Sequence, residues 1–247
     1  MRRYIAEAIG TFGLVFAGTG AIVINDVTHG GVSHVGIALT FGLIVMAMIY
    51  AVGDVSGAHL NPAVTLGFVV ARRLDPKCFL PYVMSQMIGA FLASATLLSM
   101  FGNRANLGAT QPLGSAGQSF ALEAVLTGIL MFVILCVSTG PKEVGIVAGI
   151  AIGGVIGLEA LFAGPICGAS MNPARSLAPA IISGHLMSLW IYLTAPFLGS
   201  IAAVPLWMAT RFESTKISER QLQVHAGGNI DTAVDGDAGR KGKKLRK

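Results

Sequence analysis

The sequence has few charged residues. Only 12% of its 247 residues are Asp, Glu, Lys or Arg, whereas 53% are hydrophobic. A soluble globular domain is nearer a quarter charged. Since the apolar residues gather in several long runs, the composition favours a polytopic membrane protein over a soluble domain.

Reactive groupings are also scarce. The three cysteines, Cys78, Cys136 and Cys167, have no metal-binding or redox spacing. The apolar runs contain no histidine cluster, no pair of catalytic acids and no nucleophile beside a base. We therefore expect neither an enzyme nor a bound metal ion or cofactor.

Six apolar segments are long enough to cross a bilayer, which takes roughly 20 residues. They are Tyr4–Ile24, Val35–Val52, Tyr82–Phe101, Phe120–Val137, Val144–Phe162 and Leu186–Met208. Two further apolar segments, Asn61–Val70 and Asn172–Ile182, would each reach only about 15 Å as helices. The sequence therefore predicts an all-α membrane protein with six transmembrane helices and two half-length helices.

Positive charge is unevenly distributed between the loops. With the N-terminus inside, the outer loops hold only Arg104, apart from Arg175 in a half-length segment. Because Lys- and Arg-rich loops stay on the cytoplasmic side, we expect a multi-pass protein of the cell membrane (plasma or inner), with both termini in the cytoplasm.

The end of the chain is basic. Residues 211–247 contain nine Lys and Arg against five Asp and Glu. The aromatic residues that would stack on bases are missing, so we expect no nucleic-acid binding. A disordered, basic cytoplasmic tail that contacts anionic lipid is the favoured interpretation.

The chain contains an internal repeat. AEAIGTFGLVF at 6–16 resembles LEAVLTGILMF at 122–132, and GAHLNPAVT at 57–65 resembles GASMNPARS at 168–176. Each half has three full spans, an odd number, so the second half must enter the bilayer from the opposite face. We therefore expect an inverted repeat, in which paired interrupted segments mark a permeation or binding site.

Each half-length segment begins with Asn-Pro-Ala. The residues are Asn61, Pro62, Ala63, Asn172, Pro173 and Ala174. Asparagine is a favoured N-cap, and proline is tolerated at the first helical position because its missing N–H has no partner there. Both motifs therefore predict helix starts, each preceded by small, Gly-rich residues suited to an extended backbone.

The two helix starts should face one another at the centre of the bilayer. Irregular backbone at that depth is tolerated only where it is buried in protein or lines water, and each helix N-terminus carries about half a positive charge. The side-chain amides of the two asparagines can donate to a passing oxygen. The carbonyls expected along the pore are those of Gly57, Ala58, His59, Gly168, Ala169, Ser170 and Met171. This pattern favours neutral hydrogen-bonding solutes and disfavours protons and cations.

Two alternatives remain open at this point. One Asn-Pro-Ala motif alone is equally well explained as a capped helix start in a loop, and only the second copy with matching flanks favours a pore. Inverted repeats and broken helices also occur in secondary transporters, where Glu7 and Glu123 would be the coupling-ion site. Their pairing in the repeat favours a structural role, in which each accepts hydrogen bonds from re-entrant backbone.

From Tyr4 to Met208 the chain resembles the aquaporin, or major intrinsic protein, family. The residues that carry the resemblance are SGAHLNPAVT, NPARS, Glu7 and Glu123. The resemblance implies a passive channel with no cofactor, one pore per subunit and usually a homotetramer in the lipid bilayer. It divides the chain into an aquaporin-like channel domain, 1–210, with repeat halves at about 4–101 and 120–208, and the tail 211–247.

The family's narrowest constriction corresponds by spacing to Phe41, Ala160, Ala169 and Arg175. Water-selective members generally have His and Cys at the positions of Ala160 and Ala169, and glycerol facilitators have a second aromatic and an Asp where this chain has Ser176. FAGPICGASMNPARSLAPA looks like the plant nodulin-type intrinsic proteins and their bacterial relatives. The resemblance implies passage of water, glycerol and undissociated boric or arsenous acid, with a water-selective channel as the alternative.

Three further residues have open roles. Glu159, beside Ala160, could contact the outer mouth, support the loop at 163–171 or reach the membrane interface. His59 could act as a pH gate, but a pore-facing carbonyl with a packed ring is favoured. Cys167 lies near the outer mouth, where a mercurial would block the channel if the thiol faces the pore.

Overall fold

The computed structural model describes residues 1–138 and 142–227, and every regular element within them is a helix. In chain order these are α1 (Arg2–Val27), α2 (Ser33–Ser56), α3 (Pro62–Val70), η1 (Pro76–Cys78), α4 (Phe79–Phe101), η2 (Ala105–Gly108), α5 (Ala116–Ser138), α6 (Lys142–Cys167), α7 (Pro173–Ser183) and α8 (Leu189–Gly227). The chain divides into two compact units, Met1–Trp207 and Met208–Lys247.

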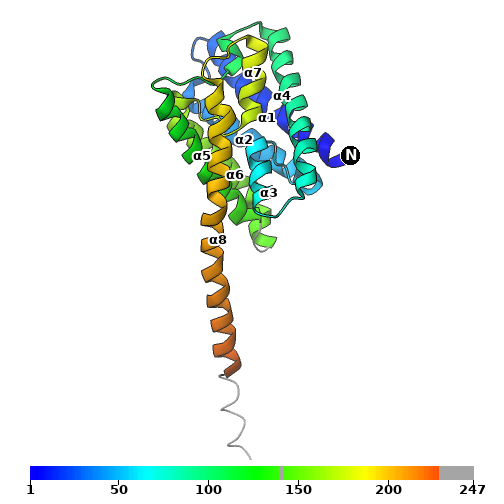
Figure 1. Cartoon of the computed structure of the whole chain (residues 1–247). Helices are drawn as coiled ribbons and strands as arrows, with labels where there is room; N and C mark the ends of the chain where they lie inside the picture. The colour runs from blue at the N-terminus through cyan, green and yellow to red at the C-terminus, as the bar shows by residue number, and fades with distance from the viewer. Residues whose placement is uncertain (139–141, 228–247) are drawn as a thin grey trace, which may run out of the picture. The chain divides into compact units, whose positions relative to one another are not determined.

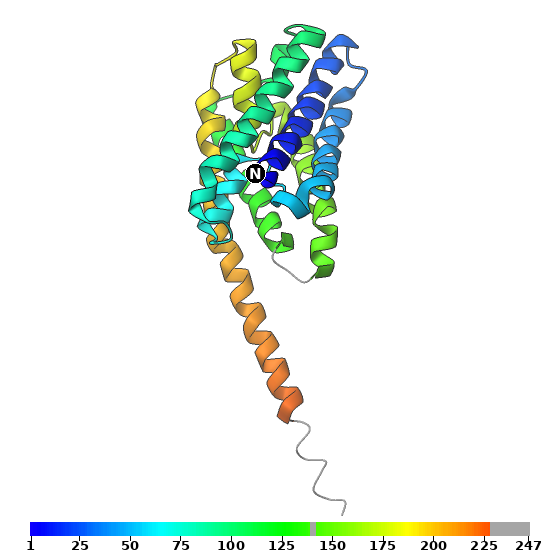
Figure 2. The ribbon, with the colours of Figure 1, turned by 90° about the vertical axis from the view of Figure 1, so that its right-hand side faces the viewer.

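Six helices of the described residues are long and apolar enough to cross a membrane. They correspond one to one with the six predicted spans, and α3 and α7 correspond to the two half-length segments. Figures 1 and 2 show α3 and α7 at opposite ends of the helix bundle of the first unit. The predicted fold class is therefore confirmed.

Glycines bring the helices close together at equivalent places in the two halves. A Cβ added to Gly89 on α4 would lie 2.9 Å from the backbone nitrogen of Phe12 on α1. A Cβ added to Gly199 on α8 would lie 2.9 Å from the backbone nitrogen of Gly128 on α5. Such small residues let helix backbones touch in a bilayer, where apolar side chains gain nothing from leaving lipid.

The loops before the two half-helices differ from the expected extended backbone. Gly57 and Gly168 have φ +87°, and the following residues Ala58 and Ala169 also have positive φ. Leu60 and Met171, directly before the asparagines, again lie in the left-handed region, at φ 53° and 54°. A non-glycine residue there costs about 1–2 kcal/mol, so the surrounding structure must compensate for this conformation.

The end of the membrane domain also differs from expectation. α8 continues as helix through Arg211–Gly227, where a disordered tail was expected. FESTKISERQLQVH contains no Gly or Pro and several good helix formers, and α8 is described as far as Gly227. The remaining tail, 228–247, lies outside the described residues.

Candidate functional site

Both half-helices begin with the same capping geometry. Asn61 has an extended backbone, and its Oδ1 accepts a hydrogen bond of 2.8 Å from the backbone N–H of Ala63. Asn172 accepts in the same way from Ala174 at 3.0 Å and from Arg175 at 3.3 Å. In each case proline occupies the first helical turn, where its missing N–H costs nothing.

The two asparagines also tie the halves to each other. Asn61 Nδ2 donates to the carbonyl of Met171 at 2.8 Å, and Asn172 Nδ2 donates to the carbonyl of Leu60 at 2.9 Å. Each asparagine therefore donates to the carbonyl of the residue directly before the other asparagine. Because an amide NH₂ has two hydrogens, each side chain keeps a second N–H, and both asparagines line the same cavity.

The Glu7 carboxylate lies behind the first loop. It accepts from the backbone N–H groups of His59 at 2.9 Å and Leu60 at 2.7 Å, and from the side chains of Ser56 and Gln86. Because N–H and C=O point in opposite directions across a trans peptide, the carbonyls of Ala58 and His59 face away from Glu7. The buried carboxylate thus fixes which way the loop presents its acceptors.

Glu123 has the equivalent position in the second half. Its two oxygens accept from the backbone N–H groups of Ser170 and Met171, each at 2.8 Å. By the same geometry the carbonyls of Ala169 and Ser170 face away from Glu123. Leu60 and Met171, the left-handed residues before the asparagines, are therefore bonded at both backbone groups. A glutamate accepts from the N–H of each, and the asparagine of the other half donates to its carbonyl.

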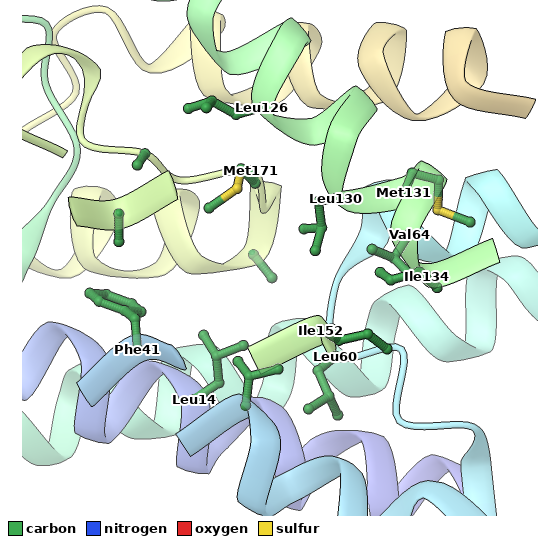
Figure 3. Close-up of a cluster of buried hydrophobic side chains, with 14 of the residues drawn as sticks. Leu14, Phe41, Leu60, Val64, Leu126, Leu130, Met131, Ile134, Ile152 and Met171 are labelled. Carbon is green, nitrogen blue, oxygen red and sulfur yellow. The ribbon is translucent and has the colours of Figure 1, made fainter. Parts of the chain in front are cut away.

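An inner cavity of about 120 Å³ runs past the two asparagines. Its wall includes residues of the hydrophobic cluster in Figure 3: Leu14, Phe41, Leu60, Val64, Leu130, Ile134, Ile152 and Met171. Residues 57–60 and 169–171 line it as well. Part of the apolar core is thus a cavity wall, and the polar side chains in this wall are those of His59, Asn61, Ser138, Ser170, Asn172 and Arg175.

A second, wider cavity of about 680 Å³, which we call the vestibule, adjoins the first. The two share Phe41, Ala160 and Arg175 in their walls, and Ala169 lines the inner cavity beside them. The structure thus brings together the four residues expected at the constriction. Gly168 lines the vestibule rather than the inner cavity.

Arg175 is fixed at this boundary. It is 2% exposed, its Cζ lies 4.9 Å from the centre of the Phe41 ring, and its Nη1 donates to the carbonyl of Gly108 at 2.8 Å. Opposite these large side chains, Ala160 and Ala169 contribute only methyl groups. The boundary can offer guanidinium donors to a solute, and it is lined by small residues on one side.

The loop that holds Arg175 has an unusual backbone. Ala105, Asn106, Leu107 and Gly108 have φ values of 45°, 48°, 54° and 71°, a left-handed turn. Ala105 and Leu107 belong to residue types that ordinarily avoid this region, so the turn could not be predicted. Its contact with Arg175 was missed by the sequence analysis.

Two tyrosines were also missed, although the repeat contains them. Tyr82 Oη donates to the carbonyl of Ser56 at 2.8 Å, and Tyr192 Oη donates to the carbonyl of Cys167 at 2.7 Å. Both carbonyls end the helix that precedes a loop. A comparison of 79–94 with 189–204 would have paired these tyrosines, because Tyr82 and Tyr192 stand in the same relation to Gly89 and Gly199.

The three residues with open roles are placed as follows. Glu159 is 6% exposed, and neither of its carboxylate oxygens has a hydrogen-bond partner among the described residues, so it neither bonds the loop nor reaches an interface. The His59 ring stacks on Phe68 with centroids 4.4 Å apart while the residue lines the inner cavity. Cys167 is fully buried, and its Sγ is 3.5 Å from the Ala163 carbonyl.

Two re-entrant segments that meet beside adjoining cavities, inside a bundle of membrane-spanning helices, define a transmembrane channel. The sequence profile of the major intrinsic protein family matches residues 1–207. The chain belongs to the major intrinsic protein family.

Known relatives agree with this membership. Aquaporin NIP1-1 of Oryza sativa subsp. japonica is 46% identical over 220 residues, which cover 89% of this chain and 78% of that protein. Nodulin-26 of Glycine max is 42% identical over 220 residues, covering 89% and 81%. The X-ray structure of the aquaglyceroporin from Plasmodium falciparum superposes with a TM-score of 0.74 at 29% identity, covering 83% of this chain and 94% of that one.

Proposed function

We propose that this protein is a passive channel for water and small uncharged solutes, including glycerol and undissociated boric or arsenous acid. The observation that carries the proposal is the pairing of Phe41 and Arg175 with two alanines, Ala160 and Ala169, where the inner cavity meets the vestibule. An imidazole in place of the Ala160 methyl would add a donor and fill space. Without it, the opening is wider and more apolar than a water-only filter, while Arg175 keeps it positive.

Exclusion of protons follows from the centre of the pore. The N-termini of α3 and α7 meet there, each with a partial positive charge, which disfavours cations. A water beside Asn61 and Asn172 accepts from their free N–H groups and donates to carbonyls on either side. Since its own oxygen is occupied as an acceptor, it cannot relay a proton along the file.

A secondary transporter is less well supported. It would need a coupling-ion site, for which Glu7 and Glu123 were the candidates. Both carboxylates already accept hydrogen bonds from the backbone of the two loops. Their oxygens hold the pore wall in place, which favours the structural role.

The membrane arrangement and assembly are part of the proposal. The charge distribution of the loops supports cytoplasmic termini in a plasma or inner membrane. Family membership supports a homotetramer with one pore per subunit. Chemical crosslinking of the protein in native membranes would test the assembly, with a ladder ending at four copies as the expected result.

The solute range is tested by stopped-flow measurements on proteoliposomes containing the whole chain. The wild type should pass water, glycerol, boric acid and arsenous acid with a low activation energy. Ala160→His should keep water flux and reduce glycerol flux at least about tenfold, the usual discrimination from filling a pocket by a few atoms.

A matched variant controls for a change on the same helix. Gly154→Ala also enlarges a side chain of α6, but its added methyl would meet nothing within 4 Å. It should therefore behave as the wild type. Fast water flux without glycerol or arsenous acid entry in the wild type would instead establish the water-selective alternative.

A further inference from the structure

One histidine beside the constriction has not been assigned a role. His34 lies at the start of α2 and lines the vestibule together with Gly164 and Arg175. Its Nε2 is 2.8 Å from the backbone carbonyl of Leu161. A Cβ added to Gly164 would lie only 3.1 Å from His34 Cε1, so the ring fits closely against α6.

The partner of His34 is a carbonyl that α6 itself cannot satisfy. In an α-helix the Leu161 carbonyl would accept from the backbone N–H four residues later. That residue is Pro165, which has no N–H. The imidazole supplies the missing donor, and this explains why the ring is held in one orientation.

This bond fixes the tautomer of the ring. A carbonyl only accepts, so Nε2 must carry the hydrogen, and in the neutral ring Nδ1 is then an acceptor. Nδ1 bonds no described residue, and it would lie 3.9 Å from a Cβ added to Gly164, which lines the vestibule as His34 does. His34 therefore offers the vestibule an acceptor in addition to the donors of Arg175.

The acceptor lies ahead of the constriction rather than within it. His34 and Phe41 are seven residues apart on α2, about 10 Å along the helix axis, and both line the vestibule. A three-carbon polyol or a boric acid molecule cannot span that separation and contact both ends. A solute at His34 would thus be bound before it reaches Phe41 and Arg175.

We propose that His34 Nδ1 forms an entry subsite in the vestibule for small neutral solutes that carry O–H groups. The solute hydroxyl donates to Nδ1, and the solute then passes to the Arg175 donors at the constriction. The subsite rests on the proposed function, since it takes the same class of solute. In this role, the subsite takes up a solute molecule from the outside water before the solute reaches the constriction.

The subsite is tested by the slowing of water flux. Vesicles containing the whole chain are equilibrated with glycerol on both sides, and water efflux is then driven by sucrose. Glycerol bound in the vestibule obstructs the file of water, so wild-type efflux should fall as glycerol rises. His34→Lys keeps a donor for the Leu161 carbonyl but has no acceptor. Its half-inhibiting glycerol concentration should rise about three- to tenfold, the factor that one neutral hydrogen bond corresponds to.

Rescue separates binding from structure. His34→Gln has both an N–H donor and an oxygen acceptor, so it should return the half-inhibiting concentration to the wild-type value. If the Lys variant matches the wild type, or if glycerol never slows wild-type efflux, the subsite is overturned. Glycerol uptake into the vesicles is measured separately. If glycerol slows wild-type water efflux but does not enter the vesicles, the proposed solute range is refuted while the subsite is retained.

Discussion

At the scale of single residues, three buried glutamates have very different surroundings. Glu7 and Glu123 accept hydrogen bonds from consecutive backbone N–H groups of the two loops. Glu159 is also buried, at 6% exposed against 0% for the other two, yet neither of its oxygens has a partner among the described residues. Burial alone therefore does not identify which acids hold the pore wall, whereas their hydrogen bonds do.

This contrast makes a direct prediction. Glu123→Gln replaces one of the two carboxylate oxygens, which accept from the N–H groups of Ser170 and Met171, with an NH₂ donor. One buried backbone N–H then has no acceptor, which should destabilise the protein by about 1–3 kcal/mol. Glu159→Gln disrupts no hydrogen bond and is the matched control. The midpoint of thermal unfolding in detergent should fall for the first variant and not for the second. An equal fall in both would contradict the assigned difference.

The centre of the pore gives a second prediction at this scale. Asn172→Asp keeps the acceptor for Ala174 and Arg175 but loses the donor to Leu60 and adds a negative charge between two helix N-termini. We expect proton or cation leakage that the wild type lacks, because the charge offsets the positive dipole ends. A pH-sensitive dye inside vesicles measures it.

A surface charge provides the control for that variant. Asn106→Asp places the same charge in the wall of the vestibule, and both Asn and Asp tolerate the left-handed backbone there. Vesicles with this variant should remain proton-tight. Leakage through both variants would show that net charge, rather than its position between the helices, matters.

At the scale of elements, each re-entrant loop is fixed at three points. A tyrosine binds the carbonyl that ends the preceding helix, a glutamate binds N–H groups of the loop, and an asparagine binds its last carbonyl. Tyr82→Phe and Tyr192→Phe each remove the first of these, a bond of 2.8 and 2.7 Å. Each should cost about 1 kcal/mol. The double variant should show the sum, since the two tyrosine bonds have different acceptors and share no partner. The free energy of unfolding in denaturant tests this additivity. If the double variant is no less stable than either single variant, the two hydrogen bonds are coupled.

The half-helices could be predicted because their signals are local. Asn-Pro at a helix start and a short apolar run are both visible in the sequence. The left-handed residues Leu60 and Met171 could not be predicted, since Leu and Met ordinarily avoid that region and only the distant glutamates compensate. The turn at 105–108 was also missed, because its stabilising contact comes from Arg175, which is distant in the sequence.

At the scale of the whole molecule, the described residues that line the two cavities all lie between Leu14 and Arg175. Removing residues 211–247 should therefore leave water permeability per protein unchanged. Stopped-flow shrinkage of vesicles with matched protein content measures this. A clear change in permeability would mean that the tail acts on the pore.

The reciprocal hydrogen bonds between the asparagines and the opposing loops have a consequence for any attempt to divide the chain. Neither half satisfies its own last loop carbonyl, since Leu60 and Met171 each depend on the other half. A polypeptide comprising one half would therefore be an incomplete passage, and it would need a second copy inserted upside down to complete it.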